Sequence, residues 1–371
     1  MANQSVGIPR FWIDFTQLAK AKGNFLNPTS DTDPGSVDIS YGEAFGYGNT
    51  TGFDDIFADK NMDVWNFDYT NTTNFSTMGS GSSAWKAIFF NPTLEWAKLF
   101  STINWVGFIN HNIFTSIGTT DLAQLQTLYF WNNGYAGSGT FVDPAVNHYV
   151  NGDFSQDGYS IFTFDFNPYG NPFGNWEDYR TFQLRLAIYS GVIFDLGAIS
   201  FGKYIDMPNS PDLQITKSIE YDGTKTVTSL GGSSFSETRH HGQPDWLVGE
   251  PWTLKDYESS GRVGRNGRRS WDLNFSYISN DDLFYDLSER VVGGTSDINS
   301  SDSTEGDFNS TDEIQQIWDL TLGGALSFLF TPDKDATNPE FAVCRLDQES
   351  LSVTQIANGV WNIKMRVVEV W

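Results

Sequence analysis

The amino-acid sequence predicts an all-β protein, and its composition and its patterning both support this. Aromatic residues make up 16% of the 371 residues, with 30 Phe and 13 Trp, and there are 35 Gly. Aromatic and β-branched residues favour strands, and Gly favours the turns between them. Short apolar or alternating segments recur between turns rich in Gly, Asn and Pro, which is typical of a β-sandwich.

The clearest strand signals in the first half lie in two segments of different pattern. Residues 103–110 (INWVGFIN) are almost continuously apolar, which predicts a strand buried on both faces. Residues 181–189 (TFQLRLAIY) alternate apolar and other residues, which predicts one buried face and one exposed face. Other strands are predicted at residues 8–15, 84–90, 127–131, 159–166 and 192–202.

The last third of the chain predicts a second set of strands. Residues 268–279 (RRSWDLNFSYIS) alternate, and we expect Trp271, Leu273, Phe275 and Tyr277 to share one face. Further strands are predicted at residues 326–333, 341–347, 351–357 and 360–371.

Helical signals are few and short. One or two helical turns are expected after the first strand, stopped by Gly23. An amphipathic helix is expected within residues 312–324, with Ser310 or Thr311 as its cap and Gly323 at its end.

The charge of the chain narrows the classes of partner. There are 46 acidic and 22 basic residues, for a net charge of −24. Such a surface repels nucleic acid and anionic membranes, so we expect neither as a partner. Cys344 is the single cysteine, and we find no signal peptide and no apolar stretch of 18 residues.

Enzymatic motifs are not found. The sequence contains no phosphate-binding glycine motif and no nucleophile elbow. Any acid pair for glycoside hydrolysis could be chosen freely from 46 carboxylates, so none is identified. We therefore expect a protein that is not an enzyme and has no cofactor.

The histidine pair and two acidic segments are the candidates for binding a metal ion. His240 and His241 are adjacent, so on a strand they would point to opposite faces and could not easily share a zinc ion. Residues 31–38 and 53–63 hold several carboxylates without the spacing of a calcium-binding EF-hand. We favour solvated acidic loops, and predict no metal.

Two residue sets are candidates for binding. The first is the basic cluster of residues 261–270, which we expect to pair with an acidic surface of a neighbouring subunit; its members are Arg262, Arg265, Arg268 and Arg269. The second is a set of loop aromatics that could stack on a sugar, although packing is the favoured interpretation; it comprises Trp131, Tyr135, Tyr169 and Trp176.

The polar end of the strand at 103–110 has two interpretations. Asn110, His111 and Asn112 follow directly on its apolar residues. We expect their side chains to satisfy backbone groups where the chain leaves the sheet. A ligand-binding rim is the alternative.

Two stretches resemble known phage proteins. Residues 103–112 (INWVGFINHN), with 195–213 (DLGAISFGKYIDMPNSPDL), resemble the galactose-binding-like, or discoidin-like, jelly-roll domains inside bacteriophage tail proteins. The segments GRRSWDLNFSYIS (267–279), GGALSFLFTPD (323–333) and FAVCRLD (341–347), with the residues from 353 to the end, are similar to the adaptor β-barrel of phage distal-tail and tail-tip proteins. Together the resemblance covers about two thirds of the chain.

The resemblance implies a domain organisation and a function. Residues 1–35 and 206–371 would form a split β-barrel or sandwich adaptor, with an inserted jelly-roll β-sandwich at 36–205. The chain would be a structural component of a virion tail, at the distal tail, tail tip or baseplate, assembled in the host cytoplasm. Its partners would be further copies of itself, in a ring or multimer, and other tail proteins. The alternative is a carbohydrate-binding module that recognises a host-surface glycan for host attachment.

Overall fold

The computed structural model confirms that the protein is mostly β-structure with a large antiparallel sheet. It describes residues 5–21, 25–26, 37–43, 65–68, 83–91, 102–113, 123–131, 146–150, 158–163, 179–189, 193–220, 224–238, 268–284, 314–337, 339–348 and 350–370. Several of these strands are described by their backbone alone.

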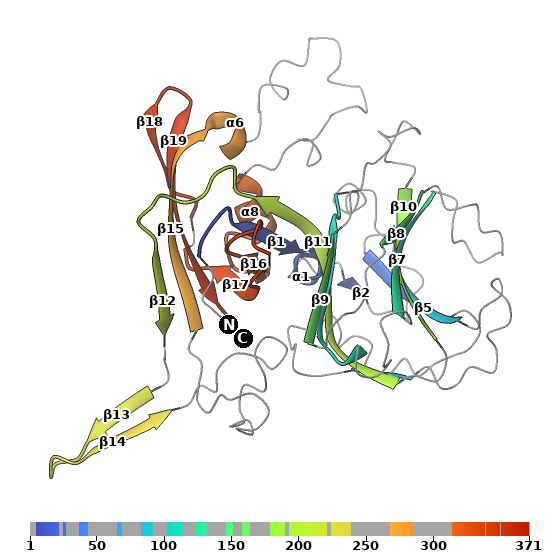
Figure 1. Ribbon diagram of the computed structural model, residues 1–371, viewed down its shortest axis with the longest axis horizontal. Coiled ribbons are helices and arrows are strands. Elements are labelled where there is room, and N and C mark those ends of the chain that lie inside the picture. Colours follow the sequence, from blue (N-terminus) through green and yellow to red (C-terminus); the bar gives the residue numbers. More distant parts are fainter. Residues whose placement is uncertain are drawn as a thin grey trace. The chain divides into compact units, whose positions relative to one another are not determined.

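The chain divides into two compact units. The first unit comprises residues 1–13 and 204–371, and the second comprises residues 14–203. The units meet at 13/14 and 203/204. The boundaries expected from the sequence are 35/36 and 205/206, so the second boundary lies within two residues of the expected one and the first does not. Both units are drawn in Figure 1, and each is described here by itself.

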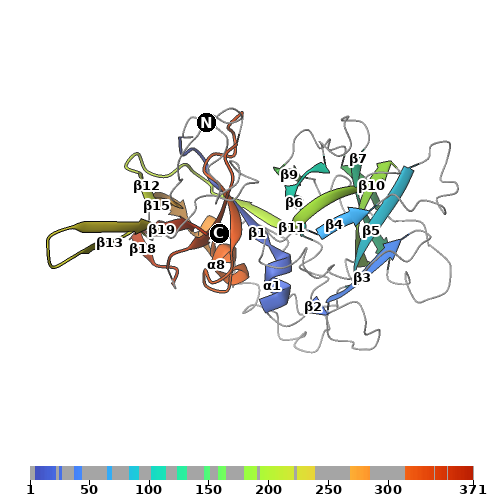
Figure 2. The ribbon, with the colours of Figure 1, turned by 90° about the horizontal axis from the view of Figure 1, so that it is seen from below.

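The first unit contains an antiparallel sheet whose strands come from both ends of the chain (Figures 1 and 2). In order across the sheet, the strands are β12 (Thr216–Glu220), β15 (Arg268–Ser279), β19 (Val360–Glu369), β17 (Ala342–Leu346), β16 (Phe328–Thr331) and β1 (Arg10–Asp14). A further strand, β18 (Val353–Ala357), pairs with β19.

Large aromatic side chains form the core of the first unit. Phe11 of β1 packs between Phe328 and Phe330 of β16, with ring centroids 5.5 and 5.2 Å apart. Trp271 of β15 packs on Phe330 at 5.1 Å and is fully buried. Burial of such side chains is worth about 1.5–3 kcal/mol each, so this cluster supplies much of the stability of the unit.

The strand β15 departs from the predicted alternation at one residue. Trp271, Leu273 and Phe275 are buried as expected, but Tyr277 is 75% exposed and Ile278 is buried in its place. A β-bulge causes this, because the pairing with β19 shifts between Phe275 and Ile278. The bulge holds Tyr277 at φ +63° and reverses the face of the residues that follow.

Two short helices are described in the first unit. α6 (Asn280–Leu283) is capped by the Ser279 hydroxyl, which accepts from the Asp282 N–H at 3.1 Å. α8 (Gln315–Leu320) has no side-chain cap, and the expected capping residues, Ser310 and Thr311, lie outside the described residues. The helix ends before Gly323, as predicted, where that residue's N–H bonds to the Trp318 carbonyl at 2.7 Å.

The second unit has two sheets. In the first, β11 (Ile193–Asp206) pairs with β6 (Trp105–His111) and with β4 (Trp65–Asp68), and β6 pairs with β9 (Gly158–Thr163). The second sheet has the strand order β2 (Phe25–Leu26), β3 (Val37–Glu43), β5 (Ser83–Asn91), β10 (Tyr179–Tyr189), β7 (Ala123–Trp131) and β8 (Val146–Val150).

The strand β6 is buried on both faces, as predicted, with Trp105 and Phe108 fully buried. At its end the side-chain Oδ1 of Asn112 accepts from the Asp195 N–H at 2.7 Å. His111 contacts the Ser160 hydroxyl through Nε2 at 3.0 Å and accepts from the Ile113 N–H through Nδ1 at 3.4 Å. His111 and Asn112 thus satisfy backbone groups where the chain leaves the sheet, as predicted for these two residues.

A buried carboxylate caps α1 (Phe15–Ala21) in the same unit. One oxygen of Asp14 accepts from the Thr16 N–H at 2.7 Å and from the Thr16 hydroxyl, and the other accepts from the Ser200 hydroxyl at 2.8 Å. Burial raises the pKa of the Asp14 carboxyl, and these hydrogen bonds oppose the rise without cancelling it.

Candidate interaction surface

One hairpin pairs with no other strand in the described part of the chain. β13 (Thr224–Thr228) and β14 (Ser234–Thr238) form a two-stranded antiparallel sheet of their own, in register from Thr224–Thr238 to Thr228–Ser234. Figure 1 shows this hairpin extending away from β12 and β15 of the same unit. We call residues 224–238 the arm.

The turn of the arm is well defined. The Ser229 carbonyl accepts a hydrogen bond from the Gly232 N–H at 2.9 Å, and the Ser229 hydroxyl accepts one from the Ser233 N–H at 3.1 Å. Gly232 adopts φ +82°, which Gly tolerates at no steric cost. This turn places Leu230 at the tip.

The two faces of the arm differ in chemistry because side chains alternate along a strand. One face carries only hydroxyl residues, at positions 224, 226, 228, 234, 236 and 238. The other face carries the pairs Lys225–Glu237 and Val227–Phe235. The second face is therefore the apolar face of the arm.

Exposed apolar side chains concentrate on the arm. Val227 is 52% exposed, Phe235 65%, and Leu230 fully exposed. Leu213 and Ile219, which precede the arm, are also exposed. A lone two-stranded hairpin is marginally stable in water, and clustered exposed apolar residues mark interaction sites. The arm is thus a surface suited to contact with another molecule.

The arm is also neutral in a strongly acidic chain. Its one Lys, Lys225, and its one Glu, Glu237, cancel, while the whole chain carries a net charge of −24. Acidic molecules that approach one another are repelled least at such a neutral region.

Arg269, one of the predicted interface arginines, lies inside the first unit. Its Nε and Nη2 donate to the two oxygens of Glu369 at 3.0 and 2.7 Å, and Nη1 pairs with Glu340. Burial would lower the pKa of this guanidinium, but the hydrogen bonds and charge of Glu369 outweigh it and raise the pKa. The ion pairs expected with a neighbouring subunit are made by Arg269 within its own unit.

The other predicted binding residues lie elsewhere. Arg268 is half-buried at the start of β15, and Arg262 and Arg265 lie outside the described residues. Trp131 ends β7, where only the backbone is described. Tyr135, Tyr169 and Trp176, and the pair His240–His241, also lie outside the described residues.

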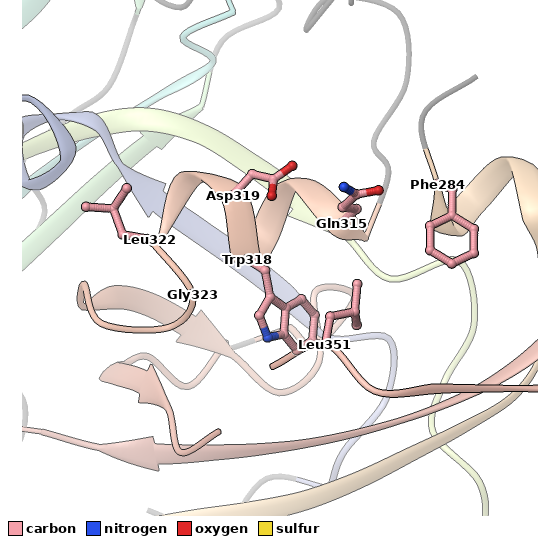
Figure 3. Close-up of a pocket in the computed structure, with 7 residues that line it drawn as sticks. All are labelled: Phe284, Gln315, Trp318, Asp319, Leu322, Gly323 and Leu351. Carbon is pink, nitrogen blue, oxygen red and sulfur yellow. The ribbon is translucent and has the colours of Figure 1, made fainter. Parts of the chain in front are cut away.

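A shallow pocket opens beside α8 in the first unit (Figure 3). Its volume is about 460 Å³, and its apolar lining is Phe284, Trp318, Leu322 and Leu351. Gln315 and Asp319 add an amide and a carboxylate at its edge on α8. The indole of Trp318 is 5% exposed, and its Nε1 finds no hydrogen-bond acceptor among the described residues.

Among the described residues, no cluster of His, Cys, Asp and Glu could hold a metal ion. The described helices include none long and apolar enough to cross a membrane. Comparison with protein-family models, with curated proteins and with solved structures found no match.

Sequence reasoning missed the arm, although a signal for it exists. In TKTVTSLGGSSFSET (224–238), hydroxyl residues alternate with Lys, Val, Phe and Glu on both sides of a Gly-Gly pair. This is the pattern of a hairpin. No strand is predicted there in the sequence analysis, because the abundance of Gly, Ser and Thr is typical of a loop.

Proposed function

We propose that this chain is a non-enzymatic structural component of a phage virion tail, at the distal tail, tail tip or baseplate, and that it assembles as a ring or multimer. The observation that carries the assembly role is the arm. Its apolar side chains at 227, 230 and 235 are exposed, and its strands pair with no other strand in the described part of the chain.

The arm supports association better than it supports chemistry. Val227 and Phe235 are direct cross-strand neighbours, so their side chains present one continuous apolar patch. Removing such a patch from water yields roughly 25 cal/mol per Å². Neither residue can take part in acid–base or nucleophilic catalysis.

The tail assignment rests on the resemblance of residues 103–112, 195–213 and the C-terminal third to phage tail domains. Under that assignment the partners are further copies of the chain and other tail proteins, and the location is the virion.

The test is the mass of the purified protein by light scattering, with negative-stain images of the same sample. Defined multimers or rings are expected. The double variant Leu230→Ser/Phe235→Ser should lower the mass toward that of one chain. The matched control is Ile356→Ser, because Ile356 is an exposed apolar residue on β18, 44% exposed, away from the arm.

Two outcomes would contradict the proposal. One is a single-chain mass for the wild type at every concentration tested. The other is an equal loss of assembly in the arm variant and the Ile356→Ser control.

A further inference from the structure

We infer that the arm of one copy binds the pocket beside α8 of the next copy. This inference rests on the proposed assembly function and names its contact. The apolar side chains of Leu230 and Phe235 would enter the space between Phe284, Trp318, Leu322 and Leu351.

The pocket matches the arm in chemistry. Four of its lining residues are apolar, and a volume of about 460 Å³ lies within the range of roughly 300–1,000 Å³ that is usual for binding pockets. Buried aromatic anchors that fill such pockets contribute most of the energy of an interface. Phe235 and Leu230 are the exposed anchors that the arm offers.

The charged groups of the two surfaces add no net repulsion to the contact. Asp319, which is exposed, lies at the edge of the pocket, and the face of the arm with Val227 and Phe235 carries Lys225 paired across the strands with Glu237, so the arm brings no net charge to Asp319.

Charge favours the neutral arm, rather than an acidic segment of the neighbouring copy, as the group that fills the pocket. Two copies each carry a net charge of −24, so most approaches between them are repulsive. The arm has no net charge, and it is the described segment where exposed apolar residues concentrate.

The geometry has a consequence for symmetry. The arm and the pocket are different surfaces, so their contact is heterologous and repeats from one copy to the next. Such a contact builds a closed ring or a filament. A contact between two arms would be isologous and would stop at a dimer.

The test uses engineered cysteines under mild oxidation. Leu230→Cys at the tip of the arm and Leu322→Cys at the pocket are made in separate chains and mixed. We expect the native Cys344 not to form disulfides in this test, because it is fully buried and its burial raises the pKa of the thiol. The matched control replaces Leu322→Cys by Ile356→Cys, since the two positions are 39% and 44% exposed.

The expected result is a cross-linked pair of chains in the Leu230→Cys and Leu322→Cys mixture, formed at least ten times faster than in the control mixture. The variant with both cysteines in one chain should give a ladder of covalent multimers in a denaturing gel.

Three results would overturn the inference. Equal cross-linking with the control would remove the pocket as the partner. A dimer from Leu230→Cys alone would indicate contact between arms. Loss of both thiols in the double variant without a change in mass would indicate a disulfide within one chain, so that the arm reaches the pocket of its own chain. In each case, the proposed function would still hold if the solution mass of the multimer falls in the arm variant Leu230→Ser/Phe235→Ser.

Discussion

Arg269 illustrates how one residue can look like a surface group in the sequence and act as a core group in the fold. It begins a strand in a cluster rich in Arg and Gly, which is typical of an exposed turn. In the structure the last residues of β19 bring Glu369 beside it, and the side chain of Glu369 is 1% exposed. Glu369 is 100 residues away in sequence, so no local pattern could predict the pair.

We predict that Glu369→Gln destabilises the first unit by about 3 kcal/mol, because it removes the more deeply buried of the two carboxylates that neutralise the Arg269 guanidinium and leaves only Glu340. Thermal unfolding by calorimetry measures the loss. The control is Asp347→Asn, which removes an ion pair with Arg366 at 3.5 Å whose side chains are 43% and 45% exposed. We expect less than about 1 kcal/mol from the control. Equal losses would contradict the structural role of Arg269.

Asp14 gives a prediction for pH. Its carboxyl has a raised pKa in the folded protein, so the folded state binds the proton more tightly than the unfolded state does. Its contribution to stability is present below its ordinary pKa of 3.8 and is lost as the pH rises through the raised value. In Asp14→Asn this loss is absent. The melting temperature of the variant relative to wild type should therefore increase from acidic to neutral pH. Parallel curves would show that Asp14 is not responsible.

At the scale of elements, strands with strong apolar or alternating patterns were predicted within a few residues of their ends. β15 is an example, because its core-facing alternation is carried by large aromatics. The bulge at Tyr277 was missed, since a bulge depends on the pairing partner, here β19, rather than on the strand's own sequence. The arm was missed because hydroxyl residues hide its period of two.

The turn after α8 gives a prediction at this scale. Gly324 adopts φ +87°, and a Cβ there would lie 2.8 Å from the Leu346 Cβ. Gly359 adopts φ +69°, with nothing within 4 Å of such a Cβ. Gly359→Ala should cost about 1–2 kcal/mol from the backbone alone. Gly324→Ala should cost clearly more, because the clash adds to that strain. Chemical denaturation of the two variants measures the difference, and equal costs would show that the Leu346 contact is not as close as described.

At the scale of the whole molecule, two interpretations of assembly predict opposite effects of salt. Contacts made by arginines on acidic neighbours would weaken as salt screens them. Contacts made by the neutral, apolar arm between copies of net charge −24 should strengthen, because salt screens the general repulsion. We predict that the dissociation constant of the multimer falls as sodium chloride rises from about 0.05 to 0.5 M. Sedimentation at several salt concentrations measures it, and a rise would favour the arginine contacts.

The order of the two units along the chain was inferred from the resemblance, which placed the second boundary at 205/206, near the division at 203/204. The identity of each unit as an adaptor or a jelly roll remains a prediction, because it depends on long-range closure of sheets that local sequence patterns do not encode.

The most direct test of the account is the solution mass of the wild type beside that of Leu230→Ser/Phe235→Ser, measured by light scattering at matched concentration. The account predicts a defined multimer for the wild type and a fall toward a single chain for the variant, with the Ile356→Ser control unchanged. A wild type that remains a single chain, or a variant that assembles as well as the wild type, would contradict the claim that the arm joins copies of this protein.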